Sequence, residues 1–435
     1  MKKLKLNIVL ILTLCFSNIK AQTVITLQAA IDTALYNNLG LRISRNEAEI
    51  ADNNATRANA GQLPSVGIVA GTTQSNTNLT QVYSTGGELN KTGVINKTYN
   101  GQLGLTWTLF DGTRMFATYE KLQVLKNMGD LNVQMRTEEL ISDVTNSYSN
   151  MVRQKLLLQG TKNNITVYQE RVKLSNTRVE IGKAARTEFL QASVDLNSQN
   201  NNLAMQETSY KNSAVELNRL MMRPPAALFD VTDSLEITPS IELESLLSKI
   251  ENGNRQLQQL RMTQQQRALE LQVQKSYSYP KVDLNAGYNF AKSSSSQGLF
   301  LKNQSYGPLV GLSLNWNVFN GNVLRKQIEN SKIVLENSKL QYDDAANTLK
   351  GMLVSAWQRY HDAVLLSAAE RDNYKMSNEN LQITTERFKL NEATILELKD
   401  AQQINEASLL RLADILYIAK TAETELMFMT GQLVK

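Results

Sequence analysis

The sequence predicts a mainly α-helical fold with a small β contribution, in which each half of the chain has the same order of helices and strands. All six prolines lie outside two long stretches, roughly residues 112–222 and 321–431. Proline removes a helical hydrogen bond, so a proline-free stretch can form a long helix. Four short segments alternate apolar and polar residues, which is the period of a strand with two different faces. The second half of the chain then repeats the motifs of the first half, which indicates a tandem duplication.

The first 21 residues are typical of a secretory signal peptide. They have a lysine-rich start, an apolar stretch from Ile8 to Phe16 and a small Ala21 at the expected cleavage point. Cleavage removes four lysines and no acid, leaving 42 of the 46 basic residues against 41 acidic ones, so net charge gives no support to nucleic-acid binding. It also removes Cys15, the one cysteine. The mature chain therefore has no disulfide, thiol nucleophile or thiolate metal site.

The first repeat is expected to span residues 22–222. A helix comes first, followed by strands at 64–73 and 101–110 and a helical hairpin at 113–222. In the second strand Leu103, Leu105, Trp107 and Leu109 alternate with glycine, threonine and glutamine. The residues between the two strands are rich in Asn, Thr, Ser and Gly, which predicts a polar loop that faces water.

An inter-repeat linker is expected at 223–240, and the second repeat at 241–435. The second repeat again has a helix, strands at 281–291 and 309–319, and a helical hairpin at 321–431. The string "LTWTLFDG" of the first half returns as "LNWNVFNG" in the second, where Val310, Leu312, Leu314 and Trp316 alternate with polar residues and glycine. This string is interpreted as the end of a strand turning into a long helix.

The two-faced strands fit either a soluble sandwich or a membrane barrel. The secretion signal, the tryptophans near strand ends and the polar opposite faces favour the membrane. Only helices and closed barrels can span lipid, and no sufficiently long apolar run remains after the signal peptide. Four strands cannot close a barrel alone, so strands in lipid would require several chains to share one barrel.

The whole mature chain resembles the TolC-like outer-membrane efflux and secretion channels. The resemblance rests on the duplicated halves and on the strings "WTLFDG", "WNVFNG", "LNRLMMRPP" and "ELMFMTGQL". It implies a homotrimer with four strands per protomer in one shared barrel in outer-membrane lipid, an α-helical tunnel across the periplasm, and the linker 223–240 at its equator. It also implies tripartite efflux or type I secretion, in which a passive channel conducts substrates from an inner-membrane pump (RND, ABC or similar) through a periplasmic membrane-fusion adaptor. The lipid-facing residues would be Leu103, Leu105, Trp107, Leu109, Val310, Leu312, Leu314 and Trp316.

The resemblance also marks the tips of the two hairpins as adaptor-docking turns. The first tip is Ile181, Gly182, Lys183 and Ala184, and the second is Leu390, Asn391, Glu392 and Ala393. The second tip departs from the family pattern, because Asn391 replaces glycine and Ala393 stands where many relatives carry arginine. Asparagine can still adopt the left-handed conformation of such a turn.

Three acidic residues next to the tips match positions that ring the tunnel entrance in the family. These are Glu397 and Asp400, which share a helix face at i, i+3, and Glu188 in the first half. From spacing alone, an ordinary solvated helix face near Lys399 is the alternative. In a trimer the carboxylates would surround one axis and favour cations.

Neither catalysis nor a cofactor is expected. His361 is the only histidine, and no nucleophile elbow, phosphate loop or histidine triad is present in the sequence. No metal site is expected, since one histidine without cysteine cannot build a familiar zinc centre. The alternative function is a periplasmic coiled-coil adaptor or scaffold that never enters the membrane.

Overall fold

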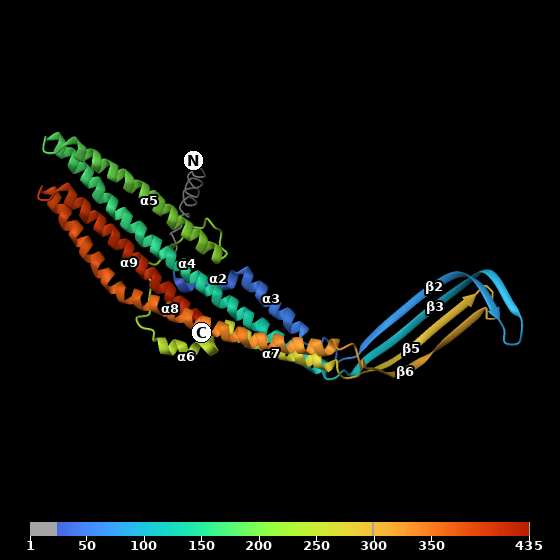
Figure 1. The fold of residues 1–435 in the computed structure, drawn as a ribbon. Coiled ribbons are helices and arrows are strands. Elements are labelled where there is room, and N and C mark those ends of the chain that lie inside the picture. Colours follow the sequence, from blue (N-terminus) through green and yellow to red (C-terminus); the bar gives the residue numbers. More distant parts are fainter. Residues whose placement is uncertain (1–23, 298–299, 435) are drawn as a thin grey trace, which may run out of the picture. The chain divides into compact units, whose positions relative to one another are not determined.

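The computed structural model describes residues 24–297 and 300–434, so the expected signal peptide and Cys15 lie outside the described residues. The first half contains β1 (Val24–Ile25), α2 (Leu27–Asn37), α3 (Leu39–Asn54), β2 (Ser65–Val82), β3 (Glu88–Phe110), α4 (Arg114–Glu180) and α5 (Arg186–Leu220). The rest contains β4 (Asp230–Val231), α6 (Leu243–Gly253), α7 (Arg255–Ser276), β5 (Lys281–Ser295), β6 (Lys302–Asn315), α8 (Val323–Lys389) and α9 (Ile395–Met429) (Figure 1).

The duplication is visible in the helix lengths. Helices α4 and α8 have 67 residues each, and α5 and α9 have 35 each. A helix of 67 residues extends about 100 Å at the usual rise per residue. None of the helices within residues 24–297 and 300–434 combines the length and apolar character needed to cross a membrane.

The chain divides into two compact units, each built from both halves of the sequence. Among the described residues, one unit consists of residues 24–44, Val133–Gln258 and residues 344–434. The other consists of Arg45–Asn132 and Gln259–Asp343 and holds the β-sheet. The two sequence repeats therefore do not form separate compact bodies.

The first of these units, which lacks the four-stranded sheet, has a core where α2 packs against α4 and α5. Ala30 and Ala34 of α2 pack against Tyr148 and Met151 of α4 and Leu217 of α5, and all five side chains are buried. Alanine on α2 lets the helices approach closely, and the larger side chains fill the space between them. The Tyr148 hydroxyl donates to the carbonyl of Ile25 (3.0 Å), so its polar atom is satisfied inside this core.

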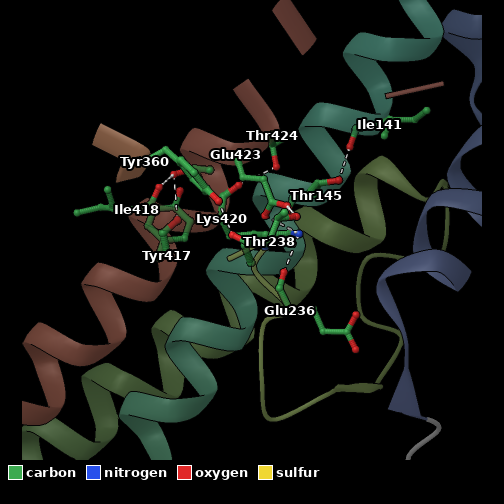
Figure 2. Close-up of polar contacts among 12 residues, drawn as sticks. Ile141, Thr145, Glu236, Thr238, Tyr360, Tyr417, Ile418, Lys420, Glu423 and Thr424 are labelled. Atoms are coloured by element: carbon green, nitrogen blue, oxygen red, sulfur yellow. Dashed lines mark hydrogen bonds and ion pairs between the residues drawn. The ribbon is translucent and has the colours of Figure 1, made fainter. Parts of the chain in front are cut away.

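The linker between the two repeats is fastened to the second hairpin by a buried carboxylate. Glu423 of α9 is 4% exposed and accepts hydrogen bonds from the hydroxyl and the backbone N–H of Thr238 (Figure 2). Lys420 pairs with Glu423 (3.0 Å) and also donates to the carbonyl of Glu236 (2.8 Å). The Tyr360 hydroxyl of α8 donates to the carbonyl of Thr238. These contacts fix the path of the linker across α8 and α9.

The four long strands form one antiparallel sheet in the order β2-β3-β5-β6 (Figure 1). Strands β2 and β3 are 18 and 23 residues long, so most of the expected polar loop between them is strand. The polar composition is misleading there, because the ladder pairs continue to Val82 and Glu88. The expected strand 309–319 is also wrong at its end, since β6 stops at Asn315. Asn315 pairs with Lys281, and the preceding Pro280 cannot donate to a ladder.

The register gives the sheet two chemically different faces, because directly opposed residues of an antiparallel pair point to the same side. Leu105 lies opposite both Val66 and Ala286, and Ala286 lies opposite Val310. We call this side the apolar face; its large or apolar side chains are Val66, Ile68, Tyr99, Leu103, Leu105, Trp107, Phe110, Val282, Leu284, Ala286, Tyr288, Phe290, Tyr306, Val310, Leu312 and Leu314.

The other side of the sheet, the polar face, carries cross-strand hydrogen bonds. The Thr108 hydroxyl donates to Asp283 (2.8 Å), and Asn285 links the Thr106 hydroxyl (3.3 Å) to that of Ser313 (3.1 Å). Such cross-strand side-chain pairs stabilise this face of the sheet.

The two copies of the strand-to-helix string, "LTWTLFDG" and "LNWNVFNG", lead into the same unusual backbone conformation. Gly112 and Thr113 both have positive φ (71° each), and so do Gly321 (67°) and Asn322 (66°). A side chain at Gly112 would meet the carbonyl oxygen of Ser276 at 2.4 Å. Two left-handed residues in succession redirect the chain from strand to helix, and glycine accepts this at little cost.

Candidate functional site

The two hairpin tips have the same backbone design. At the first, the N–H of Lys183 bonds to the carbonyl of Arg178 (2.8 Å) and Gly182 has φ of 71°. At the second, the N–H of Glu392 bonds to the carbonyl of Arg387 (2.8 Å), and Asn391 has φ of 64°. Both are helix ends closed by a left-handed residue, the Schellman arrangement. Asn391 therefore takes the conformation that glycine takes in the first half.

The tips differ in which side chains they expose. Ile181 is 59% and Leu390 68% exposed. Gly182, Lys183, Asn391 and Glu392 are also exposed, and Ala184 is half-buried. Ala393, by contrast, is buried in a small core with Phe388 and Leu398. An apolar side chain fits that position, which explains why arginine is absent from it.

Arg178 ties the two tips together. Its Nε donates to the side-chain oxygen of Asn391 (2.9 Å), one terminal nitrogen donates to the carbonyl of Phe388 (3.1 Å), and the other lies 3.6 Å from Glu188. The guanidinium also covers the Phe388 ring at 4.2 Å. A cation at the C-terminal end of α8 satisfies carbonyls that have no helical partner and complements the helix dipole. Sequence reasoning missed this residue, although the arginine precedes the turn in both repeats.

We expect Arg178→Met to loosen the tips without unfolding the chain. The substitution keeps much of the apolar stem but removes two charge-assisted hydrogen bonds, at a local cost of about 1.5–3 kcal/mol. Hydrogen exchange of residues 386–394 should become faster, and exchange of α2 should not change. Arg186→Met, at an exposed arginine of the same tip, provides the control. Equal exchange rates in wild-type protein and Arg178→Met would contradict this role.

The predicted gate residues lie in different environments. Glu397 forms a capping box with Thr394: its carboxylate accepts from the Thr394 N–H (2.6 Å), and the Thr394 hydroxyl accepts from the Glu397 N–H (3.2 Å). Hydrogen bonds from the backbone and hydroxyl of Thr394 lower the pKa of Glu397. Asp400 is exposed one turn later. Glu188 is paired with Arg178 and only 21% of its side chain is exposed.

A layer of buried polar side chains lies between the hairpins behind the tips, and no sequence signal marked it. Arg171 is 1% exposed. It forms an ion pair with Asp195 of α5, donates to Gln402 of α9 (2.8 Å) and lies over the Tyr168 ring at 5.3 Å. Lys399 approaches the same Asp195 carboxylate at 3.6 Å. One arginine of α4 thus connects three helices.

A second carboxylate of this layer, Glu406, has neutral partners. It accepts from the Tyr168 hydroxyl (3.2 Å), Gln199 (3.2 Å) and Asn164 (3.4 Å). Burial raises the pKa of Glu406, and these hydrogen bonds only partly offset that effect. The folded protein therefore binds this proton more tightly than the unfolded chain does.

The raised pKa of Glu406 has a consequence for the pH dependence of stability. The penalty of an ionised buried carboxylate develops as pH rises from about 4.5, its ordinary value, through the higher folded pKa. Glu406→Gln should therefore unfold at a higher temperature than wild-type protein at pH 7.5, and the difference should vanish near pH 4.5. Melting curves at both pH values measure this. Lower stability of the variant at pH 7.5 would contradict the assignment.

The structure places six of the eight residues predicted to face lipid on the apolar face: Leu103, Leu105, Trp107, Val310, Leu312 and Leu314. Leu109 is not in the ladder, because a register shift between Thr108 and Phe110 puts Phe110 opposite Val282 instead. Trp316 lies just past the end of β6, and its ring N–H donates to the carbonyl of Ser278 (3.2 Å). Trp107 donates to Gln62 in the same way (3.0 Å).

Within the described ranges, no group of three His, Cys, Asp or Glu side chains is arranged to hold a metal ion. His361 stacks on Trp357, with ring centroids 4.8 Å apart and planes 17° apart. This contact gives the histidine a packing role.

Comparison with known proteins agrees with this architecture. The chain is 25% identical over 403 residues to nodulation protein T of Rhizobium leguminosarum bv. viciae, a match covering 87% of this chain and 76% of that protein. The outer membrane protein VceC of Vibrio cholerae superposes with a TM-score of 0.75 at 16% identity, over 93% of this chain and 96% of VceC. The CmeC outer membrane channel of Campylobacter jejuni gives 0.77 at 15% identity, over 94% and 86%.

The family model for outer membrane efflux proteins matches residues 30–221 and 246–432. The two matched segments correspond to the two halves of the duplication and together cover most of the chain. The chain therefore belongs to the outer membrane efflux protein family.

Proposed function

We propose that three copies of this chain form a channel-tunnel that conducts substrates out of the cell. Each copy contributes its four-stranded sheet to one shared barrel, with the apolar face toward lipid and the polar face toward the lumen. The helical hairpins form a tunnel through the periplasm. An inner-membrane pump supplies the energy, and a periplasmic adaptor docks on the tips, in tripartite efflux or type I secretion.

The observation that carries this proposal is the sheet itself. It has one apolar and one polar face, and β2 and β6 are edge strands on opposite sides. Unpaired backbone groups of an edge strand are costly in lipid. Pairing β6 of one copy with β2 of the next would satisfy both edges, and three copies supply enough strands to close a barrel.

The scaffold alternative does not fit the family. Outer membrane efflux proteins are channels of the outer membrane and not enzymes, and this chain shares their fold over nearly its whole length. A two-faced sheet with strands of 14 to 23 residues also exceeds what a small periplasmic domain needs.

The narrow end of the tunnel is proposed to be gated by Glu397 and Asp400. Three copies of these carboxylates around one axis would attract cations, and a narrow passage focuses their field. The pairing of Glu188 with Arg178 gives it a smaller share of this charge. Ile181 and Leu390 are the exposed apolar side chains that an adaptor would cover.

A charge-neutral variant tests the gate. Glu397→Gln with Asp400→Asn preserves size, and glutamine can still complete the capping box. We expect planar-bilayer recordings of the double variant to lose cation selectivity and the block by trivalent cations added from the tip side.

The control for the gate removes two exposed acids of α8 instead, with Asp362→Asn and Glu379→Gln. It should behave as wild type. Unchanged cation selectivity and unchanged block in the gate variant would mean that Glu397 and Asp400 lie on an ordinary solvated helix face and do not form a gate.

A further inference from the structure

We propose that Lys97, Lys292 and Lys302 form a binding site for the phosphate groups of outer-leaflet lipids. The proposal rests on the proposed function, since it requires the apolar face to lie in the membrane. It adds a specific lipid contact to that placement.

The register of the sheet brings the three lysines together on the apolar face. Lys97 of β3 lies opposite Ser294 of β5, and Ser294 lies opposite Lys302 of β6. With strands about 4.8 Å apart, the Cα atoms of Lys97 and Lys302 are about 10 Å apart on either side of a small serine. Lys292 lies two residues from Ser294 on the same face of β5. Three flexible ammonium groups can therefore converge on one phosphate.

The position along the strands matches a headgroup region. From Phe110 to Tyr99 the apolar face of β3 extends about 34 Å, or roughly 26 Å across the membrane at the usual strand tilt. The apolar band of an outer-membrane barrel is about 25 Å tall and is bordered by aromatic residues. Tyr99, Phe290 and Tyr306 provide such a border at the end remote from the long helices, and Lys97 follows directly.

The lysines have no acidic partner in the residues that the structure describes. None of the ion pairs among the described residues involves Lys97, Lys292 or Lys302. The four strands carry two acids. Asp283 lies on the polar face at the other end of the sheet and pairs with Lys281 (2.9 Å), and Glu88 lies at the tip of the β2–β3 hairpin.

The three-lysine cluster therefore lies on the apolar face at the hairpin end of the sheet, whereas Lys281 at the helix end is paired with Asp283. Basic side chains just beyond a hydrophobic surface attract anionic headgroups. The long lysine stems can cover apolar surface while the ammonium groups reach the headgroup layer. A phosphorylated lipid of the outer leaflet supplies both the chain that the apolar face needs and the anion that the lysines need.

The test uses the full chain purified in detergent, with native mass spectrometry to count bound lipid. The probes are a bisphosphorylated glycolipid, the same glycolipid without its phosphates, and inorganic phosphate. Lys97→Gln/Lys292→Gln/Lys302→Gln should weaken binding of the phosphorylated glycolipid roughly 100-fold. Replacing the same three lysines with arginine should preserve it.

A charge-matched control removes three exposed lysines of the helices, Lys211, Lys332 and Lys375, by substitution with glutamine. It should bind like wild type. Equal binding by the first glutamine variant, or by glycolipid without phosphate, would overturn the proposal. Full competition by millimolar inorganic phosphate would do the same, because it would identify a site for soluble anions.

Flotation with uncharged phosphatidylcholine vesicles separates this proposal from the channel proposal. If wild-type protein and the glutamine variant both float with the vesicles, the sheet enters lipid and the glycolipid result decides the lysine site alone. If wild-type protein does not float, the channel proposal fails and the lipid site fails with it.

Discussion

Val310→Arg is expected to prevent most of the protein from inserting into the outer membrane. Val310 is 77% exposed at the middle of the apolar face, in the row of Leu105 and Ala286. An arginine on the lipid side of a barrel costs about 2–4 kcal/mol near the bilayer midplane. In the proposed trimer each of the three copies would carry this arginine, so the assembled channel would bear the cost three times. The outer-membrane fraction should therefore hold little of this variant.

The neighbouring residue provides the matched control. Gly311 lies opposite Asn285 on the polar face, and a side chain added there would meet no atom within 4 Å. Gly311→Arg changes the same strand by the same charge but lies on the polar face, which is proposed to line the lumen, so this variant should insert and assemble. If the two variants reach the membrane equally, the assignment of the two faces is wrong.

Arg171→Met is expected to lower the free energy of unfolding by about 3–5 kcal/mol, the usual cost of removing one partner of a buried ion pair. Burial acts to raise the pKa of Asp195, but hydrogen bonds from Arg171 and Gln191 outweigh it and hold that pKa below its usual value. Without Arg171 the carboxylate keeps Lys399 at 3.6 Å, which places the loss toward the lower end of this range. Denaturation followed by circular dichroism measures it.

The pH dependence and a control sharpen this test. A lowered folded pKa means that the Asp195 contribution is present above about pH 3.8 and is lost as pH falls further, so wild type and Arg171→Met should converge in acid. Arg219→Met removes an exposed arginine paired with Glu216 and should cost less than about 1 kcal/mol. Similar losses for the two variants at pH 7 would contradict the structural role of Arg171.

The repeat, the hairpins and the two faces of the sheet could be predicted because each leaves a local pattern. Alternation of Leu103, Leu105 and Trp107 marks a strand face, and the absence of proline marks the long helices. The left-handed backbone at Asn391 could also be predicted, since asparagine tolerates it better than other residues with side chains.

The remaining features depend on contacts that sequence patterns do not report. The distal parts of β2 and β3 are polar, so only ladder pairing identifies them as strands. The register shift beside Phe110 takes Leu109 out of the ladder, and no local sequence pattern marks that shift. Arg171 and Gln402 are 231 residues apart, and only the folded hairpins bring them together.

The claim that three copies share one barrel can be tested by disulfide formation between the edge strands. Cys15 is the one cysteine of the sequence and lies in the expected signal peptide, so the mature chain is expected to have no cysteine. Ile68→Cys on β2 is combined in turn with a cysteine at each alternate position of β6 from Gln304 to Leu314, and outer membranes are oxidised and run on a denaturing gel. The account predicts that one register yields a band at three times the mass of the chain. Monomer bands at every position, from protein recovered in the outer membrane, would contradict it.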